Sequence, residues 1–204
     1  MSHKRYPLRV PRVAAGIRAQ ETRSLSTRCW WHVRWVETLE AMGLGGRLGR
    51  GKNYALSGQV TRLEFERGSG GPGRPFSRVL ADVVGARPDP YRVSADFRTP
   101  TGEARARIVA RLRAEPMLVA RLLVNDLPTE VEEIFRDEGF SLFPGGKLAP
   151  RTYDVTTACS CPDYANPCKH SAAVLLILGE EIARRPATLV ELRGIELREL
   201  YDED

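Results

Sequence analysis

No long hydrophobic run occurs in this sequence. The longest uninterrupted apolar stretch is the seven residues Ala172–Leu178, whereas a membrane-spanning helix needs about 20. The N-terminal residues carry positive charge but lack the apolar segment that follows such charge in a secretory signal. We therefore expect no membrane-spanning helix, no membrane partner and a cytoplasmic location.

Cysteine is also scarce. Four cysteines in 204 residues are too few for a scaffold held together by disulfides. Three of them lie within ten residues of one another, a clustering that indicates metal binding in a reducing compartment.

The length allows one domain, or one domain and a small module. A hydrophobic content of 42% and a charged content of 28% are typical of a globular protein.

Lysine is rare, because only 4 of the 31 basic residues are lysines. The net charge of +5 is distributed unevenly along the chain. Residues 1–60 carry a net charge of +8, and residues 151–204 carry −4. A basic front half suits a polyanion such as DNA, and an acidic tail suits a protein partner. An ordinary solvated surface would explain the same charges, so both interpretations stay open.

Hydrophobic periodicity predicts an α+β fold with a small antiparallel sheet. Prolines and scattered arginines without a period predict a flexible basic arm over residues 1–24. Within an α+β domain over residues 25–150, Trp31, Trp35 and Leu39 recur on one face of a helix. That spacing favours tryptophans in a core over tryptophans that stack on bases. Alternating apolar and polar residues predict antiparallel strands over 54–98, followed by helices over 101–139.

A short basic stretch follows the tryptophan helix. Arg47, Arg50 and Lys52 stand among glycines, and Tyr54 comes next. We predict a glycine-rich loop there, in which the basic side chains contact phosphates and Tyr54 stacks on a base. A plain solvated loop is an equally good interpretation of these residues.

The most specific pattern lies near the C-terminus. Cys159, Cys161, Cys168 and His170 follow the spacing C-x-C-x(6)-C-x-H, and three thiolates with one imidazole suit tetrahedral zinc. A predicted strand ends at the first pair, and a predicted helix begins at the second. A helix N-terminus favours the net negative charge of such a centre. Lys169, between the last two ligands, could reach a phosphate from there.

Three other uses of these residues fit the pattern less well. Buried structural thiols would not require a histidine beside them. A C-x-C disulfide is strained, and a redox pair leaves His170 unexplained. Catalytic zinc keeps one position open, whereas four soft side chains fill the tetrahedron. We therefore expect a structural zinc and no enzyme activity, with a thiol redox sensor or a zinc hydrolase as less favoured alternatives.

The string Cys-Ser-Cys-Pro-Asp-Tyr-Ala-Asn-Pro-Cys-Lys-His, between a strand and an apolar helix, resembles the SWIM zinc finger in its bacterial form. Segments 30–35, 49–60, 88–93 and 127–135 are similar to a longer bacterial family that carries this finger near its C-terminus, so the resemblance covers about residues 27–200. It divides the chain at about residue 150, with a finger and C-terminal helices over 151–204.

The resemblance implies zinc binding and, beyond it, binding of DNA or protein. Members of that family are often encoded near helicase-like ATPases of the chromatin-remodelling superfamily, which implies such an ATPase as a partner. The expected function is therefore a zinc-binding adaptor that binds DNA, a helicase-like remodelling ATPase, or both. The alternative is a protein–protein recruitment module that makes no contact with nucleic acid.

Overall fold

The computed structural model describes residues 11–20, 29–68, 76–144, 147–149 and 152–202. The strands are β1 (Val60–Gly68), β2 (Phe76–Val83), β3 (Tyr91–Arg98), β4 (Lys147–Ala149), β5 (Thr152–Tyr153) and β6 (Val155–Cys159). The helices are α1 (Trp30–Ala41), α2 (Gly46–Leu56), α3 (Gly102–Arg113), α4 (Pro116–Leu123), α5 (Thr129–Asp137), α6 (Lys169–Arg184), α7 (Ala187–Leu192) and the short 3-10 helix η2 (Leu197–Leu200).

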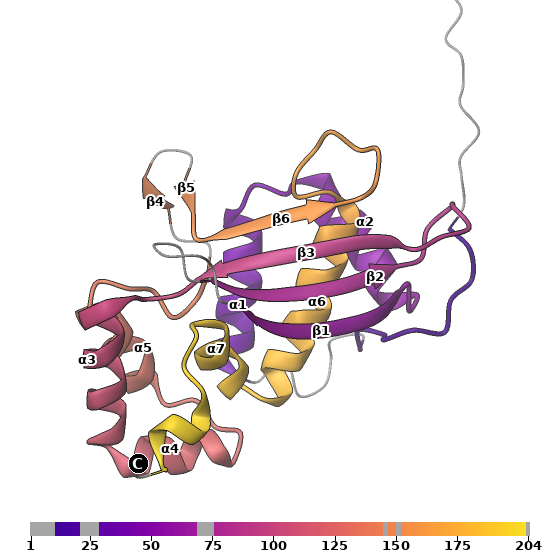
Figure 1. The fold of residues 1–204 in the computed structure, drawn as a ribbon. Helices are drawn as coiled ribbons and strands as arrows, with labels where there is room; N and C mark the ends of the chain where they lie inside the picture. The colour runs from indigo at the N-terminus through magenta and orange to yellow at the C-terminus, as the bar shows by residue number, and fades with distance from the viewer. Residues whose placement is uncertain (1–10, 21–28, 69–75, 145–146, 150–151, 203–204) are drawn as a thin grey trace, which may run out of the picture.

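Two layers make up the larger part of the molecule. An antiparallel sheet in the order β1-β2-β3-β6 carries α1, α2 and α6 on one face, and α3, α4 and α5 form a separate group beside it (Figure 1). The predicted α+β class and antiparallel sheet are confirmed. None of the helices that the structure describes has both the length and the apolar composition that crossing a membrane would require.

The strands alternate as the sequence predicts. On β3 the side chains of Tyr91, Val93, Ala95 and Phe97 are buried under the helices, and the positions between them are partly or fully exposed. β2 and β6 keep the same alternation, whereas β1 has a bulge between residues 60 and 62 and exposes Phe65. The sheet therefore has one apolar face and one wet face.

Two arginines on the wet face of the sheet pair with carboxylates of the same face. Arg78 donates two hydrogen bonds to Asp96, at 2.6 and 3.0 Å. Arg62 forms ion pairs with Glu64 and Asp82. These pairs leave the described part of this face close to neutral, so it offers little attraction for a polyanion.

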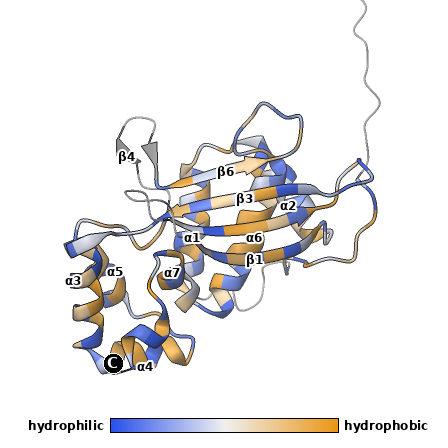
Figure 2. Cartoon of the chain, in the orientation of Figure 1, coloured by the Kyte–Doolittle hydropathy of each residue, from blue (hydrophilic) through white to orange (hydrophobic). Residues whose placement is uncertain are grey.

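Helix α6 is the centre of the core. Most of its side chains are buried, and its hydrophobic character along much of its length is visible in Figure 2. Trp35 of α1 is 1% exposed and its indole N–H donates to the carbonyl of Leu175, at 3.0 Å. Gly179 makes room for the indole, because a Cβ there would lie 2.6 Å from Trp35 Cδ1. The prediction that this tryptophan anchors a core is confirmed.

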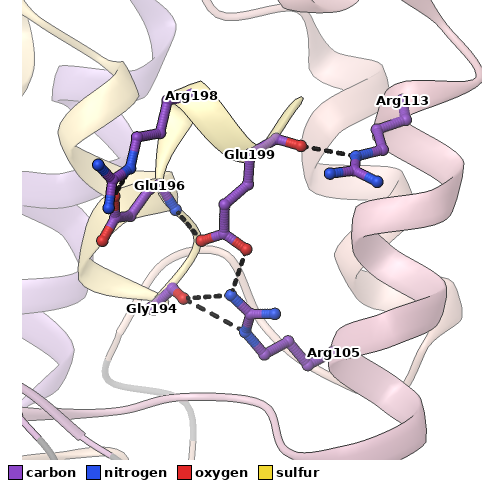
Figure 3. A network of polar contacts seen from close by, with 6 residues as sticks. All are labelled: Arg105, Arg113, Gly194, Glu196, Arg198 and Glu199. Carbon is purple, nitrogen blue, oxygen red and sulfur yellow. Dashed lines mark hydrogen bonds and ion pairs between the residues drawn. The ribbon is translucent and has the colours of Figure 1, made fainter. Parts of the chain in front are cut away.

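The C-terminal segment is tied to α3 by the network in Figure 3. Arg105 donates to the Glu199 carboxylate at 2.6 Å and to the Gly194 carbonyl at 3.2 Å, and Arg113 donates to the Glu199 carbonyl at 2.6 Å. Partial burial acts to raise the pKa of the Glu199 carboxyl, but the Glu196 N–H and Arg105 outweigh it, so the pKa is lowered overall. Glu199 therefore stays ionised and holds η2 against α3.

A fully buried arginine joins α7 to the sheet. Arg193 is 0% exposed and donates to the Asp154 carboxylate at 2.6 Å, to the Leu142 carbonyl at 3.1 Å and to the Arg98 carbonyl at 2.8 Å. Its guanidinium also lies over the Phe140 ring, 5.0 Å from the centroid. Burial lowers the pKa of Arg193, and the Asp154 carboxylate acts in the opposite direction. The charge is thus compensated inside the core.

The predicted flexible arm is wrong for residues 11–20. Their backbone lies against the start of the sheet, where the N–H of Gly16 donates to Gly58 at 2.9 Å and that of Ile17 donates to Val60 at 2.7 Å. The remainder of the predicted arm, 1–10 and 21–24, lies outside the described residues. The division near residue 150 stays a prediction about domains, although β6 pairs with β3 and α6 shares the core with α1 and α2.

The predicted loop around Arg47, Arg50 and Lys52 is also wrong, because these residues lie in α2. Helix α2 packs closely on α6 at Gly51, where a Cβ would stand 2.6 Å from the Ala172 Cβ. Burial of this contact outweighs the low helix propensity of three glycines within α2.

Two glycines of α2 provide a matched test of this contact. Gly51→Ala is expected to reduce the free energy of unfolding by about 1–3 kcal/mol, because the added methyl overpacks against α6. At Gly49 a Cβ would meet nothing within 4 Å, so Gly49→Ala is expected to stabilise by about 0.5–1 kcal/mol through helix propensity. Urea denaturation of the zinc-loaded proteins measures both changes. Equal effects of the two substitutions would contradict the close approach of α2 and α6.

Candidate metal centre

The end of the sheet presents the first two cysteines. Cys159 is the last residue of β6 and lies opposite Val93 of β3. Beyond it, the N–H of Ser160 donates to the Arg92 carbonyl at 3.0 Å, and the Ser160 hydroxyl accepts from the Arg92 N–H at 3.0 Å. The backbone that leads into Cys161 is therefore fixed by the neighbouring strand.

The loop between the two ligand pairs is tied back to β6. The Asn166 amide donates to the Thr157 carbonyl at 2.6 Å and accepts a hydrogen bond from the Thr157 hydroxyl. Near the tip, the Asp163 carboxylate accepts from the N–H of Ala165 at 3.1 Å in a local turn. These bonds bring the chain back to Cys168 at the start of α6.

Helix α6 positions the second pair. Cys168 is its N-cap residue, and its sulfur accepts a hydrogen bond from the N–H of Ser171 at 3.5 Å. His170 follows in the first turn and is 3% exposed. A thiolate at a helix N-terminus is stabilised both by this N–H and by the helix dipole.

The four predicted ligands converge on one point. The sulfurs of Cys159, Cys161 and Cys168 and one ring nitrogen of His170 all lie within 4.8 Å of one another. His170 Nδ1 is 3.7 Å from the Cys159 sulfur and 3.8 Å from the Cys168 sulfur. Tetrahedral zinc with its usual bond lengths places sulfur and nitrogen about 3.6 Å apart. The donors are thus of the right kind and at the right spacing for zinc, and the predicted ligand set is confirmed.

Comparison with known proteins agrees with this geometry. Residues 152–179 match the family model described as SWIM zinc finger. This segment is a SWIM zinc finger. The chain is also 36% identical over 194 residues to the uncharacterized protein Rv2102 of Mycobacterium tuberculosis (strain ATCC 25618 / H37Rv). That match covers 95% of this chain and 65% of the relative, so the chain spans a little under two thirds of its length. No solved structure matches the chain significantly.

Protonation within the SWIM finger is uneven. Hydrogen bonding from Cys159 lowers the pKa of the Cys168 thiol, with help from His170 and Ser171. The same shared hydrogen bond, with burial, raises the pKa of Cys159. Cys168 is thus the sulfur that carries a negative charge first. Binding of zinc displaces the remaining thiol protons, as ligand thiols require.

Two tyrosines clamp the histidine of the SWIM finger. The His170 ring stacks on Tyr91 with centroids 4.4 Å apart, and its other side meets the edge of Tyr54 at 5.1 Å. Gly85 lets Tyr91 approach, because a Cβ there would lie 2.4 Å from the Tyr91 ring. Tyr91 and Gly85 were not predicted as site residues, since only the fold brings them to the finger. These rings fix the imidazole with Nδ1 toward the sulfurs.

The other predicted site residues do not form the predicted phosphate-binding loop. Tyr54 is 9% exposed, so its ring supports His170 and has little surface left to stack on a base. Burial raises the pKa of Tyr54, and negative charge on Cys161 and Cys168 raises it further. Arg47 donates to the carbonyls of Leu44 at 3.1 Å and Gly43 at 3.3 Å, where it caps the end of the preceding segment.

Three cations of the predicted set remain available. Arg50 and Lys52 are exposed on α2, and neither forms an ion pair within the described part of the chain. Lys169 stands in the first turn of α6 with its ammonium 5.4 Å from the centre of the Tyr54 ring. Their predicted role in nucleic-acid binding stays a prediction.

Proposed function

We propose that this chain is a nonenzymatic adaptor whose SWIM finger, held by zinc, displays a surface that binds DNA. The observation that supports it most directly is the set of four protein donors within 4.8 Å of one another. Four such donors complete a tetrahedron and leave no position for an activated water. The metal then acts on structure, and function depends on the surface that it stabilises.

Charge favours nucleic acid as a partner of that surface. Many arginines of the described residues are engaged with carboxylates, as Arg78 is with Asp96 and Arg107 is with Glu138. Cations that face no carboxylate are left at the finger end and on α2. Such unpaired cations gain the most from phosphates, because binding releases counterions without breaking an ion pair.

A protein partner is the second candidate, and α4 is the observation that favours it. Met117 and Val124 are 71% and 73% exposed, and Leu123 is 49% exposed. Exposed apolar side chains grouped on one short helix are typical of contact surfaces. We propose a helicase-like remodelling ATPase as the partner, with both proteins in the cytoplasm, and the resemblance of the chain to the longer bacterial family supports this choice.

The DNA-binding proposal predicts a marked salt dependence. Zinc-loaded protein is expected to bind fluorescent DNA at 50 mM salt and to lose affinity as salt rises. The slope of log K against log salt should be about −2 to −3 if three phosphates are contacted. Fluorescence anisotropy measures it. Absence of binding at 50 mM salt would contradict the DNA proposal and favour recruitment through protein contacts alone.

The nonenzymatic proposal predicts no hydrolysis. Nuclease and peptidase assays of the zinc-loaded protein are expected to show no turnover, because all four metal positions are filled by side chains. His170→Ala is the informative control, since it would open one position. An activity that co-purifies with the wild type and disappears in this variant would show a catalytic zinc instead.

A further inference from the structure

A group of cations without carboxylate partners lies at the end of the molecule that carries the finger loop. Arg87 is exposed in the turn that precedes β3, and Lys169 begins α6. Arg12 lies against the same turn and donates to the Pro88 carbonyl at 2.7 Å. Within the described residues these side chains form no ion pair, in contrast to the paired arginines on the wet face of the sheet. Figure 1 shows the finger loop beside this end of β3.

A small cavity separates two of these cations. It measures about 260 Å³, lies between the finger loop and the β2–β3 turn, and is lined in part by the zinc ligands Cys161 and His170. Arg87 stands over the Tyr91 ring at 5.6 Å, and Lys169 stands over the Tyr54 ring at 5.4 Å. Both tyrosines pack on His170, so the zinc ligand and the two cations share one support. The cations are thereby held toward the cavity by cation–π contacts.

The finger loop carries a free aromatic ring beside this cavity. Tyr164 is fully exposed and directly follows Asp163, which lines the cavity. Its neighbours are held on both sides, through Asp163 to Ala165 and through Asn166 to Thr157. The backbone under the ring is therefore ordered by the loop and by the adjacent ligands, so that little entropy is lost when the ring makes a contact.

We propose that this end of the molecule binds a single-stranded nucleic acid, with a phosphate between Arg87 and Lys169 and a base stacked on Tyr164. The inference rests on the proposed DNA-binding function and names its contact surface. An exposed aromatic ring at a loop tip can stack only on a base whose face is accessible. In a duplex the base faces are covered by neighbouring bases, whereas a single strand leaves them accessible. Asp163 and Asp89 oppose the local positive charge, so stacking supplies a larger share of the affinity than on a uniformly basic surface.

The test uses the full zinc-loaded chain and three labelled probes of equal length. The probes are a 20-nucleotide oligothymidine, the same strand without bases, and a duplex. Wild type is expected to bind oligothymidine most tightly. Tyr164→Ala should weaken that binding by about 5- to 150-fold, the range of one lost base stack, and should leave binding of the strand without bases unchanged. Tyr164→Phe, which keeps the ring, should restore most of the affinity.

Two further variants separate the parts of the surface. The double substitution Arg87→Gln and Lys169→Gln is expected to make the salt slope for oligothymidine shallower by about 1.4, as two lost phosphate contacts require. Tyr201→Ala is the matched control, since Tyr201 is 54% exposed but belongs to the C-terminal segment beside α4. It should bind as the wild type does. Zinc content of every variant confirms that the finger is intact.

The results that would contradict the contact surface differ from the result that would contradict DNA binding itself. If Tyr164→Ala binds oligothymidine like the wild type while the double substitution Arg50→Gln and Lys52→Gln removes binding, the contact surface is α2 and this proposal is wrong. The proposed function would then stand. Tighter binding of the duplex than of the single strand would also overturn the proposal. If no probe binds at 50 mM salt, the DNA-binding function itself fails.

Discussion

Cys168→Ser is expected to abolish stoichiometric zinc binding and to loosen α6. The Cys168 sulfur is both a ligand and the N-cap acceptor of this helix, and the serine oxygen is a poor replacement for a thiolate. Structural zinc in finger peptides supplies about 10–16 kcal/mol of apparent binding free energy near neutral pH. A domain is stable by only about 5–15 kcal/mol in total, so the variant is expected to be partly or wholly unfolded at 25 °C.

Metal analysis and circular dichroism measure this effect. The wild type should carry one zinc per chain, and a chelator should reproduce in it the loss of helical signal seen in the variant. Cys29→Ser is the matched control, because Cys29 lies at the start of α1 outside the ligand cluster. This control should keep its zinc. One equivalent of zinc retained by Cys168→Ser would show that the ligand assignment is wrong.

Arg193→Met is expected to lower the free energy of unfolding by about 3–5 kcal/mol. Methionine keeps much of the volume but removes the guanidinium that donates to the Asp154 carboxylate in the core, and removal of one partner of a buried ion pair is costly. The carbonyls of Leu142 and Arg98 also lose their donors. Urea denaturation of the zinc-loaded protein measures the change.

An exposed arginine on the same chain segment provides the comparison. Arg185 pairs with Glu191 on the surface, with a side chain 44% exposed, so Arg185→Met should cost no more than about 1 kcal/mol. Adding Asp154→Asn to Arg193→Met should recover part of the loss, because it removes the buried negative charge that Arg193 had paired with. Similar losses for Arg193→Met and Arg185→Met would mean that the buried pair contributes no more than a surface pair.

The metal centre was predictable because its information is local. All four ligands fall within 12 consecutive residues, and the chemistry of thiolates and imidazole leaves few alternatives. The alternation on β3 and the helical spacing of Trp35 and Leu39 were predictable for the same reason, since each periodicity is set by neighbouring residues.

The features that the sequence did not predict depend on distant contacts. Glycines and arginines around Arg50 favour a loop locally, yet α2 is helical because it packs on α6 some 120 residues later in the chain. Tyr54 was expected on the surface, although its ring belongs beside His170. Nothing in the local sequence marks Arg193 as buried, since most arginines lie in solvent, and only the fold brings Asp154 and two carbonyls around it.

The sharing of α6 between the SWIM finger and the core determines how this finger can be used as a module. The helix that supplies His170 also receives the indole of Trp35 and packs on α2. A peptide of residues 152–179 would contain the four ligands, but its helix would lack the surfaces of α1 and α2 that cover it in the full chain. This finger is therefore not portable: transplanting it into another protein would require transplanting β3, α1 and α2 with it.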